Sequence, residues 1–224
     1  MIPILEDEFR IPADAHTFEG FERWLESDEF PETGRIDFLA GNVEVDLCSE
    51  DLFTHNGVKV AVGSTLASLV IPEDRGEIFF SGARFTSHTA EISVEPDVQV
   101  ILSDSLASGQ VRLIPSPRLG PDRFSGFTGA PDLIVEIISD ESAGKDAKRL
   151  PPLYARAGVP ELWTIDARGE KLQFRIGTLQ GGTYIAVEPD SEGWHPSPRL
   201  GGSFRLTRRR AGPCPWRYTL EHRN

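Results

Sequence analysis

A carboxylate inside an apolar run constrains the fold of this chain more than any other feature of its sequence. Residues 131–140 read PDLIVEIISD, in which the stretch 133–138 has the pattern of a buried strand apart from Glu136. Successive side chains of a strand point to opposite faces, so Glu136 shares a face with Ile134 and Ile138. An unpaired buried charge costs several kcal/mol. The sequence therefore predicts that Glu136 is paired, protonated or bound to a metal ion.

A second acid, Asp97, stands in a similar context, directly before the apolar run of residues 98–102. If the two strands are neighbours, Asp97 and Glu136 converge on one hard divalent cation, which prefers carboxylate oxygens and keeps positions open for water and phosphate. Lys145 and Lys148 follow on the next predicted helix, where either could contact a phosphate or activate an attacking water. The alternative is that Asp97 only begins a strand and Glu136 pairs with a lysine, without chemistry.

The size and charge of the chain limit the kinds of protein it can be. With 224 residues it is long enough for one α/β domain with additions, and cramped for two. A formal net charge of −12 argues against a protein that coats nucleic acid through bulk electrostatics. An enzyme that meets DNA through a local basic patch is still compatible with it, and residues 145–149 and the FRLTRRR run at 204–210 are two such patches. The simpler interpretation of the second run is a solvated strand end.

The sequence offers no targeting segment and no thiolate metal site. The first residues, MIPILEDEFR, lack the basic start and long apolar core of a signal peptide, and no run approaches the roughly 18 apolar residues of a membrane span. We therefore expect a cytoplasmic protein without a membrane span. Cys48 and Cys214 are far apart, which predicts two isolated thiols.

The order of the predicted elements indicates an α/β protein with a central mixed sheet flanked by helices. Ser49 is a candidate N-cap for a long helix that ends near Pro72. The Gly/Pro/Ser-rich stretch of residues 105–131 reads as a long loop. The other expected elements are a helix within residues 14–27, a hairpin with its turn at 40–42, a strand at 161–167, a hairpin with its turn at 181–182, and a Pro/Gly-rich end at 193–224.

Three segments carry a family resemblance: EPDVQV at residues 95–100, GAPDLIVEIISDESAGKDAKRL at 129–150 and YARAGVPELWTIDA at 154–167. In this order they resemble the Uma-two family of endonucleases, within the PD-(D/E)xK nuclease superfamily. The resemblance covers roughly residues 36–176 and is strongest over 129–167. It implies a restriction-endonuclease-like core and cleavage of a DNA phosphodiester bond assisted by magnesium or manganese.

The resemblance also implies roles for individual residues. Asp97 matches the metal-binding acid of the second core strand, and Glu136 matches the acid of the third. The lysine that the superfamily keeps two residues after that glutamate is replaced here by Ile138. In this family the lysine moves to the following helix, where Lys145 in the pair KD is the first candidate and Lys148 the second.

Further residues have expected roles near the site. Asp37 and Glu44 are candidates for an additional acid, because some superfamily members take a carboxylate from the N-terminal region. His55 matches a position where the family often has histidine, although a partly buried helix histidine is the simpler interpretation. We expect Asp132 to anchor the loop before the strand, and Tyr154 to pack between helix and sheet.

The predicted domain organisation has three regions. A helical lead-in spans residues 1–34, a restriction-endonuclease-like nuclease domain spans 35–192, and a C-terminal extension spans 193–224. Three functions stay open: a metal-dependent DNA endonuclease, a catalytically silent nuclease-fold protein that binds nucleic acid or a protein partner, and an enzyme that acts on small phosphate compounds. A homodimer is a further expectation, since a duplex has two strands to cut.

Overall fold

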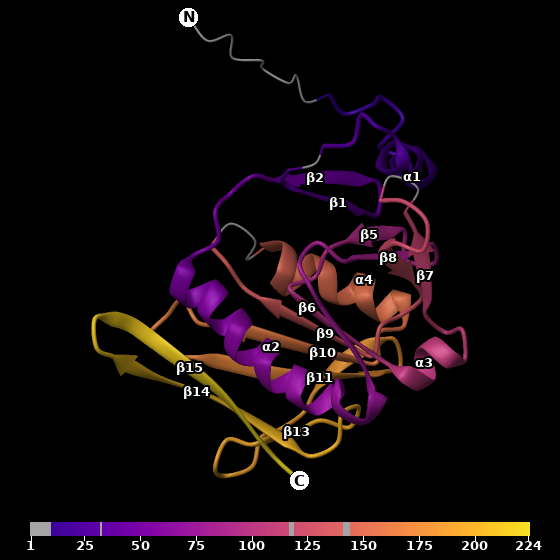
Figure 1. Cartoon of the computed structure of the whole chain (residues 1–224). Helices are drawn as coiled ribbons and strands as arrows, with labels where there is room; N and C mark the ends of the chain where they lie inside the picture. The colour runs from indigo at the N-terminus through magenta and orange to yellow at the C-terminus, as the bar shows by residue number, and fades with distance from the viewer. Residues whose placement is uncertain (1–9, 32, 117–118, 141–143) are drawn as a thin grey trace, which may run out of the picture.

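The central sheet contains both strands that the predicted acids belong to. In this computed structural model, which describes residues 10–31, 33–116, 119–140 and 144–224, six strands form a mixed sheet in the order β12-β11-β10-β9-β6-β3 (Figure 1). β9 pairs in parallel with β10 and antiparallel with β6, which confirms that the two predicted strands are neighbours. The strands are β3 (Gly76–Phe80), β6 (Val98–Leu102), β9 (Leu133–Ile137), β10 (Glu161–Asp166), β11 (Gln173–Gln180) and β12 (Thr183–Ala186).

A second six-stranded sheet has the order β2-β1-β5-β4-β8-β7. Its first hairpin turns at Ala40 and Gly41, whose φ angles of 46° and 89° match a two-residue turn of type I′. The sequence predicted this hairpin but not the sheet to which it belongs. The strands are β1 (Arg35–Leu39), β2 (Asn42–Asp46), β4 (Arg84–Ser87), β5 (Ile92–Val94), β7 (Arg112–Pro115) and β8 (Phe124–Thr128).

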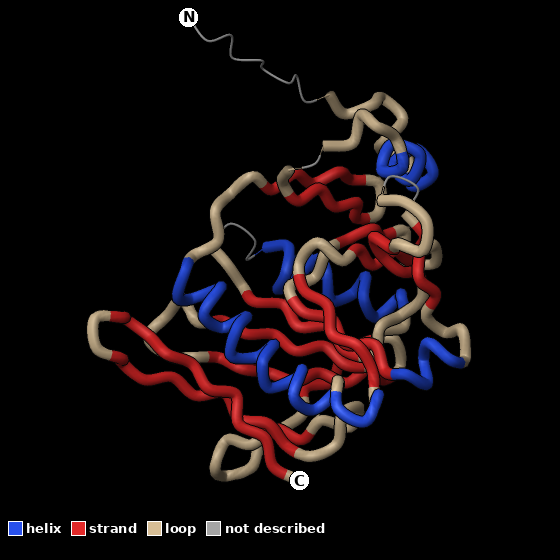
Figure 2. Tube along the Cα trace, in the orientation of Figure 1, coloured by secondary structure: helices blue, strands red, loops and turns tan. Residues whose placement is uncertain are grey.

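One face of the central sheet is covered by α2 (Gly57–Val70), which crosses the strands in Figure 2. Its buried residues Val62 and Leu66 belong to the same hydrophobic core as Val100 of β6 and Val135 of β9. The apolar side chains of β9 that share the face of Val135 therefore serve this core, as the alternation of the strand requires.

The opposite face of the central sheet packs on α4 (Leu150–Ala157) and, beyond it, on the second sheet. Ile134 of β9 lies in this core with Tyr154 of α4 and Phe85 of β4, and the rings of Phe85 and Tyr154 have centroids 6.3 Å apart. Tyr154 thus packs between helix and sheet as predicted. Pro151 and Pro152 fall in the first turn of α4, where a missing N–H is tolerated, so the helix changes there from the π-turn η3 (Lys145–Arg149) instead of breaking.

The N-terminal helix is shorter than the predicted segment. α1 (Phe18–Glu26) begins after the N-cap Thr17, whose hydroxyl accepts a hydrogen bond from Gly20 N at 3.1 Å. Its residues Phe21 and Trp24 pack with Phe38 of β1 in a third core. The helix therefore closes one end of the second sheet (Figure 1).

Asp51, rather than Ser49, caps the long helical segment, so that prediction was wrong. The segment begins with the π-turn η1 (Leu52–Asn56), and the Asp51 carboxylate accepts hydrogen bonds from Phe53 N at 2.8 Å and Thr54 N at 2.5 Å. A carboxylate satisfies two of the free N–H groups of the first turn at once, which a hydroxyl cannot do as well.

Residues 105–131 are not the long loop that their composition predicts. The stretch includes part of α3 (Ser103–Ala107) and the strands β7 and β8, and β8 pairs in parallel with β4. A Cβ atom on Gly126 would lie 2.5 Å from the Arg84 carbonyl oxygen. Glycine in a strand permits such a close approach of two backbones. Gly126, which the sequence alone would place in a loop, therefore lies in a strand of the sheet here.

The C-terminal residues form a third sheet instead of an irregular end. It consists of β13 (His195–Pro196), β14 (Ser203–Ala211) and β15 (Cys214–Arg223) in that order. The ring of Phe204 packs tilted against Trp163 of the central sheet with ring centroids 4.8 Å apart, and the Thr65 hydroxyl on α2 donates to the Leu220 carbonyl oxygen at 2.9 Å. This sheet therefore covers α2 and one end of the first core, while the domain boundaries at residues 34/35 and 192/193 stay a prediction.

Asp132 connects the loop before β9 to its surroundings, in the anchoring role that the sequence suggested. Its carboxylate accepts hydrogen bonds from Leu102 N at 2.6 Å and from the Ser105 hydroxyl at 2.9 Å. Arg199 of the C-terminal segment also donates to it, through Nε at 2.7 Å. Asp132 is fully buried and satisfied by these groups, which leaves it no role as a metal ligand.

In the part of the chain that the structure describes, none of the helices combines the length and the apolar character that a membrane span needs.

Leu66 offers a direct test of the first core. Leu66→Ala should lower the free energy of unfolding by about 2 to about 5 kcal/mol, because the side chain is fully buried and its removal leaves a cavity. Val60→Ala in the same helix is the matched control, since Val60 is 69% exposed, and it should change the free energy by no more than about 0.5 kcal/mol. Urea unfolding followed by circular dichroism measures both, and equal effects would contradict the placement of α2.

Candidate active site

Asp97 and Glu136 lie opposite each other where the β6–β9 ladder ends. The antiparallel register pairs Val98 with Val135, so one step further along both strands brings Asp97 opposite Glu136. The backbone N–H of Ile137 donates to Asp97 Oδ2 at 2.7 Å, which ties the acid of one strand to the backbone of the other. Both carboxylates are about as buried as any core residue, at 1% exposure.

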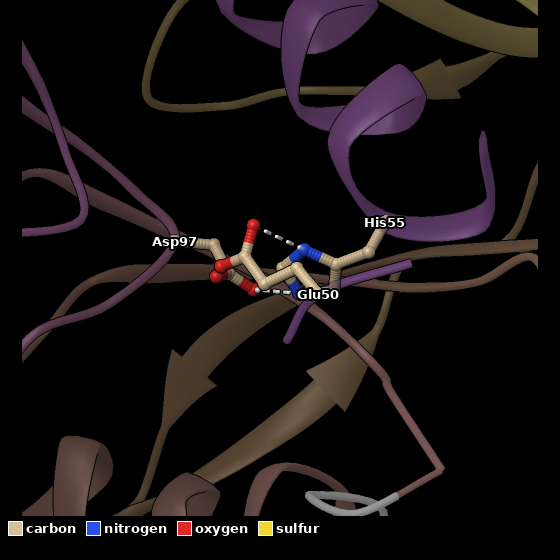
Figure 3. Close-up of side chains that lie close together, drawn as sticks. All are labelled: Glu50, His55 and Asp97. Carbon is tan, nitrogen blue, oxygen red and sulfur yellow. Dashed lines mark ion pairs between the residues drawn. The ribbon is translucent and has the colours of Figure 1, made fainter. Parts of the chain in front are cut away.

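His55 and Lys59 reach Asp97 from the beginning of the long helical segment. Figure 3 shows the His55 ring between the carboxylates of Asp97 and Glu50. His55 Nε2 lies 3.3 Å from Asp97 Oδ2, and His55 Nδ1 lies 3.2 Å from Glu50 Oε2. Lys59, one helical turn after His55, places its Nζ 3.4 Å from Asp97 Oδ1 and 2.8 Å from Glu50 Oε1. Two acids and two basic groups thus meet in one cluster.

The charges in this cluster support one another. Burial disfavours ionisation of Asp97, but the hydrogen bond and charge of His55, with the charge of Lys59, outweigh it and lower the pKa of Asp97 to about 2. Burial alone would lower the pKa of His55, whereas its hydrogen bond to Asp97 and the charges of Asp97 and Glu50 raise it above the ordinary value. Asp97 is therefore ionised at neutral pH, and His55 is protonated over a wider pH range than a free histidine.

Glu136 is held from the opposite face of the sheet. The Tyr154 hydroxyl of α4 donates to Glu136 Oε1 at 2.5 Å. Burial and the nearby charge of Glu136 raise the pKa of Tyr154 well above its usual range, so the hydroxyl keeps its proton and stays a donor. The core-packing residue predicted from sequence therefore also orients the candidate catalytic carboxylate.

A third buried acid, Asp37 of β1, approaches the same place from the second sheet. Its Oδ2 accepts from Arg35 Nε at 3.0 Å and from Lys145 Nζ at 2.9 Å. Burial opposes the charge of Asp37, but the charges of Arg35 and Lys145 outweigh it and lower the pKa of Asp37. Burial also opposes the charge of Arg35, yet its pKa is raised because Asp37, Glu136 and Asp97 all act on it. Arg35 thus contacts Asp37 directly, and the charges of Glu136 and Asp97 also act on it.

The other residues predicted from the sequence have distinct surroundings. Lys145 lies against Asp37, with only 9% of its side chain exposed. Lys148 is exposed and forms no ion pair with any carboxylate in the described ranges. Glu44 pairs with Arg149 at the surface of β2. The structure therefore associates Asp37 and Lys145 with the buried site, and Lys148 and Glu44 with its periphery.

Sequence reasoning missed Glu50, Lys59 and Arg35. A signal for Lys59 was present, since it lies four residues after His55 and side chains at that spacing share one helix face. Arg35 precedes Asp37 by two residues and therefore shares its strand face. No sequence pattern indicated that Glu50 belongs to the site, because its position depends on the path of the chain between β2 and η1.

The cluster has the ligand types that a divalent cation needs. One ligand atom from each of Glu50, His55 and Asp97 lies within 4.8 Å of the others. Asp97 Oδ1 and His55 Nδ1 make no hydrogen bond among the described residues, and their neighbours are the ion-pair partners Lys59 Nζ at 3.4 Å and Glu50 Oε2 at 3.2 Å. A metal ion bound there would replace these ion pairs and the proton on His55. Carboxylate oxygens with an imidazole nitrogen suit Mg²⁺ or Mn²⁺, and the nitrogen favours the second.

A cleft of about 440 Å³ opens onto this cluster. His55, Glu50 and Arg35 line it together with Ser139, which follows β9, and with the segment 46–49 that connects β2 to the helix. The cleft therefore reaches the cluster through Glu50, His55 and Arg35, while Asp97 and Glu136 lie behind its lining at 1% exposure.

Comparison with known proteins identifies the family. The sequence model of the family Uma2, described as "Putative restriction endonuclease", matches residues 18–209. The chain belongs to the Uma2 family. This match confirms the resemblance to the Uma-two endonucleases and extends it in both directions beyond residues 36–176. No curated protein matches the chain.

A solved structure supports the fold of this Uma2 protein. The crystal structure of a "putative nuclease belonging to DUF820" from Anabaena variabilis ATCC 29413 is 20% identical to it, with a TM-score of 0.60. The similarity covers 83% of this chain and 90% of the other. At this identity the likeness concerns the fold, and it confirms the predicted α/β nuclease architecture with a mixed sheet flanked by helices.

The ion pair between His55 and Asp97 predicts a defined pH dependence of stability in metal-free protein. Because the pKa of folded His55 is raised above 6.5, the stabilisation is complete below that value and is lost as the pH rises through the folded pKa. Because the pKa of folded Asp97 is lowered from 3.8 to about 2, its own contribution is present above 3.8 and is lost only as the pH falls towards 2.

The measurement compares wild type with His55→Gln by urea unfolding in EDTA between about pH 5 and about pH 9. The difference in the free energy of unfolding should be largest at the acidic end and should narrow towards alkaline pH. His16→Gln, at an exposed position near the N-terminus, is the control and should show little difference at any pH. A His55→Gln difference that does not change with pH would contradict the pairing with Asp97.

Proposed function

We propose that this Uma2 protein is a metal-dependent DNA endonuclease that hydrolyses phosphodiester bonds. The observation that carries the proposal is the register that brings Asp97 opposite Glu136, both buried, at the end of β6 and β9. Family membership and a nuclease fold favour the same reaction class. Burying two carboxylates costs free energy of desolvation, and apolar residues at the same positions would stabilise the core at least as well. The presence of the acids therefore favours a chemical role.

Asp97 and Glu136 would hold the metal ion, Mg²⁺ or Mn²⁺, and His55 is a candidate third ligand through its contact with Asp97. When bound, the ion would supply a water of lowered pKa and polarise a phosphoryl oxygen. Tyr154 keeps Glu136 in place through its hydrogen bond, and Ile137 N–H does the same for Asp97. Such fixed ligands are what a hydrolytic metal site requires of its protein.

Several basic side chains could stabilise the charge that develops on the phosphate. Ile138 occupies the position two residues after Glu136 where the superfamily usually has its lysine. Lys145, the first candidate from the sequence, donates a hydrogen bond to Asp37. Lys59 is an additional candidate, because its Nζ is 3.4 Å from Asp97 Oδ1. We propose Lys59 as the lysine that contacts phosphate or water, and Lys145 as a positioning residue that keeps Asp37 and Arg35 in place.

A second candidate function is a catalytically silent protein of the same fold that binds nucleic acid or a protein partner. It is favoured by the cations already present, since Arg35, Lys59 and Lys145 can neutralise the buried acids without a metal. The strongly acidic composition also favours it. In this case the ion pairs would serve stability, and no divalent cation would be needed.

Cleavage assays with Glu136→Gln distinguish the two functions. Purified protein is incubated with supercoiled plasmid or single-stranded DNA in Mg²⁺ or Mn²⁺, and products are followed on gels. Wild type should cut, and Glu136→Gln should lose about 100-fold or more of the rate, because an isosteric amide keeps the packing and removes the ligand charge. Glu77→Gln, on the exposed side of β3, is the control and should cut like wild type. Equal cutting by all three proteins, or none by wild type, would contradict the endonuclease function.

The lysine assignment has its own test in the same assay. Lys59→Met should reduce the cleavage rate by about 100-fold with little change in the Mn²⁺ concentration needed for half-maximal rate, since the lysine acts on phosphate or water. Lys145→Met should raise that Mn²⁺ requirement more than Lys59→Met does, because it disturbs Asp37 and Arg35. Lys148→Met, at an exposed position, should have a cleavage rate close to that of wild type. A larger loss of rate in Lys148→Met than in Lys59→Met would overturn the assignment.

A further inference from the structure

The hairpin of β14 and β15 concentrates positive charge on a strongly acidic protein. The chain has a net charge of −12, yet residues 207–218 contain four arginines and no aspartate or glutamate. Figure 1 shows the tip of this hairpin extending beyond the edge of the central sheet. Such a segregated basic segment is the electrostatic signature expected of a contact with a polyanion.

Two of these arginines lie side by side in an arrangement that costs stability. Arg209 and Arg217 are cross-strand partners in the β14–β15 register, so their side chains point to the same face, and both are exposed. Like charges directly opposite each other in a sheet are destabilising. Neither arginine forms an ion pair with a carboxylate in the described part of the chain. The pair therefore has no internal counterion in the described part of the chain, and both guanidinium groups are open to an external anion.

The other two arginines fix the hairpin. Arg208 and Arg210 lie over the ring of Trp216, 4.0 and 4.1 Å from its centroid to the guanidinium carbons. Arg208 also donates to the carbonyl oxygens of Ala167 at 2.8 Å and Glu170 at 2.9 Å. These contacts tie the backbone of the hairpin to the turn after β10, so the outer face has a defined position when a ligand binds it.

The hairpin also lies beside the turn that carries His55. β15 packs against both α2 and η1, and Tyr218 approaches Gly57 at the junction of the two. A groove of about 470 Å³ runs between these elements and is lined by Phe53 and Asn56 on one side and by Trp216 and Arg217 on the other. The hairpin therefore contacts the same turn, η1, that supplies His55 to the candidate active site.

We propose that the outer face of the hairpin, formed by Arg209 and Arg217, binds the sugar-phosphate backbone of duplex DNA outside the metal site. The inference deepens the proposed function, on which it rests for the choice of DNA as the polyanion. Guanidinium groups bind phosphate in a fork geometry, and two of them on neighbouring strands match a repeating anion. An acidic protein needs such a local contact, since its overall field repels DNA.

The test measures DNA binding without cleavage. Fluorescence anisotropy of a labelled duplex in EDTA gives the binding constant at several salt concentrations for wild type and for the double variant Arg209→Ala/Arg217→Ala. Loss of two phosphate contacts should weaken binding and reduce the slope of log K against log salt by about 1.8. The double variant Arg209→Lys/Arg217→Lys keeps the charge and should retain most of the slope.

A matched control separates this local contact from a change of total charge. Arg112→Ala/Arg123→Ala removes two exposed arginines, one on β7 and one directly before β8, and should leave the slope close to the wild-type value. An equal loss of slope in both alanine variants, or no loss in either, would overturn the proposal, as would wild-type protein that does not bind duplex DNA. The binding assay contains EDTA and does not depend on the metal site. If wild type failed to cleave DNA but the alanine variant still had the smaller salt slope, the result would contradict the proposed enzyme function and leave the DNA contact of the hairpin supported.

Discussion

The bond from Ile137 N–H to Asp97 Oδ2 is the interaction on which the rest of the site depends. It fixes the orientation of the buried Asp97 carboxylate at the end of the β6–β9 ladder and so determines which side chains can contact it. His55 and Lys59 approach from η1 and α2, and Glu136 stands opposite on β9. An acid in this position is tolerated only because each of its oxygens has a polar or cationic neighbour.

The electrostatics of the site follow from this arrangement. Asp37, Asp97 and Glu136 come from two sheets and are all nearly inaccessible, so their mutual repulsion must be offset by Arg35, Lys59 and Lys145. The resulting network lowers the pKa of Asp37 and of Asp97 and so keeps these two acids ionised, which is the state that a divalent cation requires of its ligands. The same network ties η3, which follows β9 of the central sheet, to β1 of the second sheet, because Lys145 donates to the Asp37 oxygen that also accepts from Arg35. Stability and the candidate chemistry therefore rest on the same side chains.

The sequence predicted those parts of the structure that local patterns determine. The alternation in residues 133–138 and the run at 98–102 identified β9 and β6, and a carboxylate in each pointed to one shared site. The hairpins at 40–42 and 181–182 followed from turn residues that tolerate positive φ. The family resemblance added the order of the elements and the prediction that a lysine comes from outside β9.

What the sequence could not predict depends on contacts between distant segments. Gly126 reads as a loop residue until β4 lies against it, and the stretch 105–131 becomes β7 and β8 only through that pairing. Arg35 and Glu50 acquire their surroundings from the packing of the second sheet and of η1 on the first. Lys145 had the expected type and position along the chain, but the path of η3 directs it to Asp37, a partner that spacing alone does not reveal.

The central claim is that Asp97 and Glu136 share one divalent cation, and crystals soaked in Mn²⁺ test it most directly. Anomalous diffraction at the manganese absorption edge would place the ion without reference to activity. The account predicts one strong peak within about 2.0 to 2.6 Å of a carboxylate oxygen of Asp97 and of Glu136. A peak held by Glu50 and His55 without Glu136, or no peak near Asp97 at saturating Mn²⁺, would contradict it.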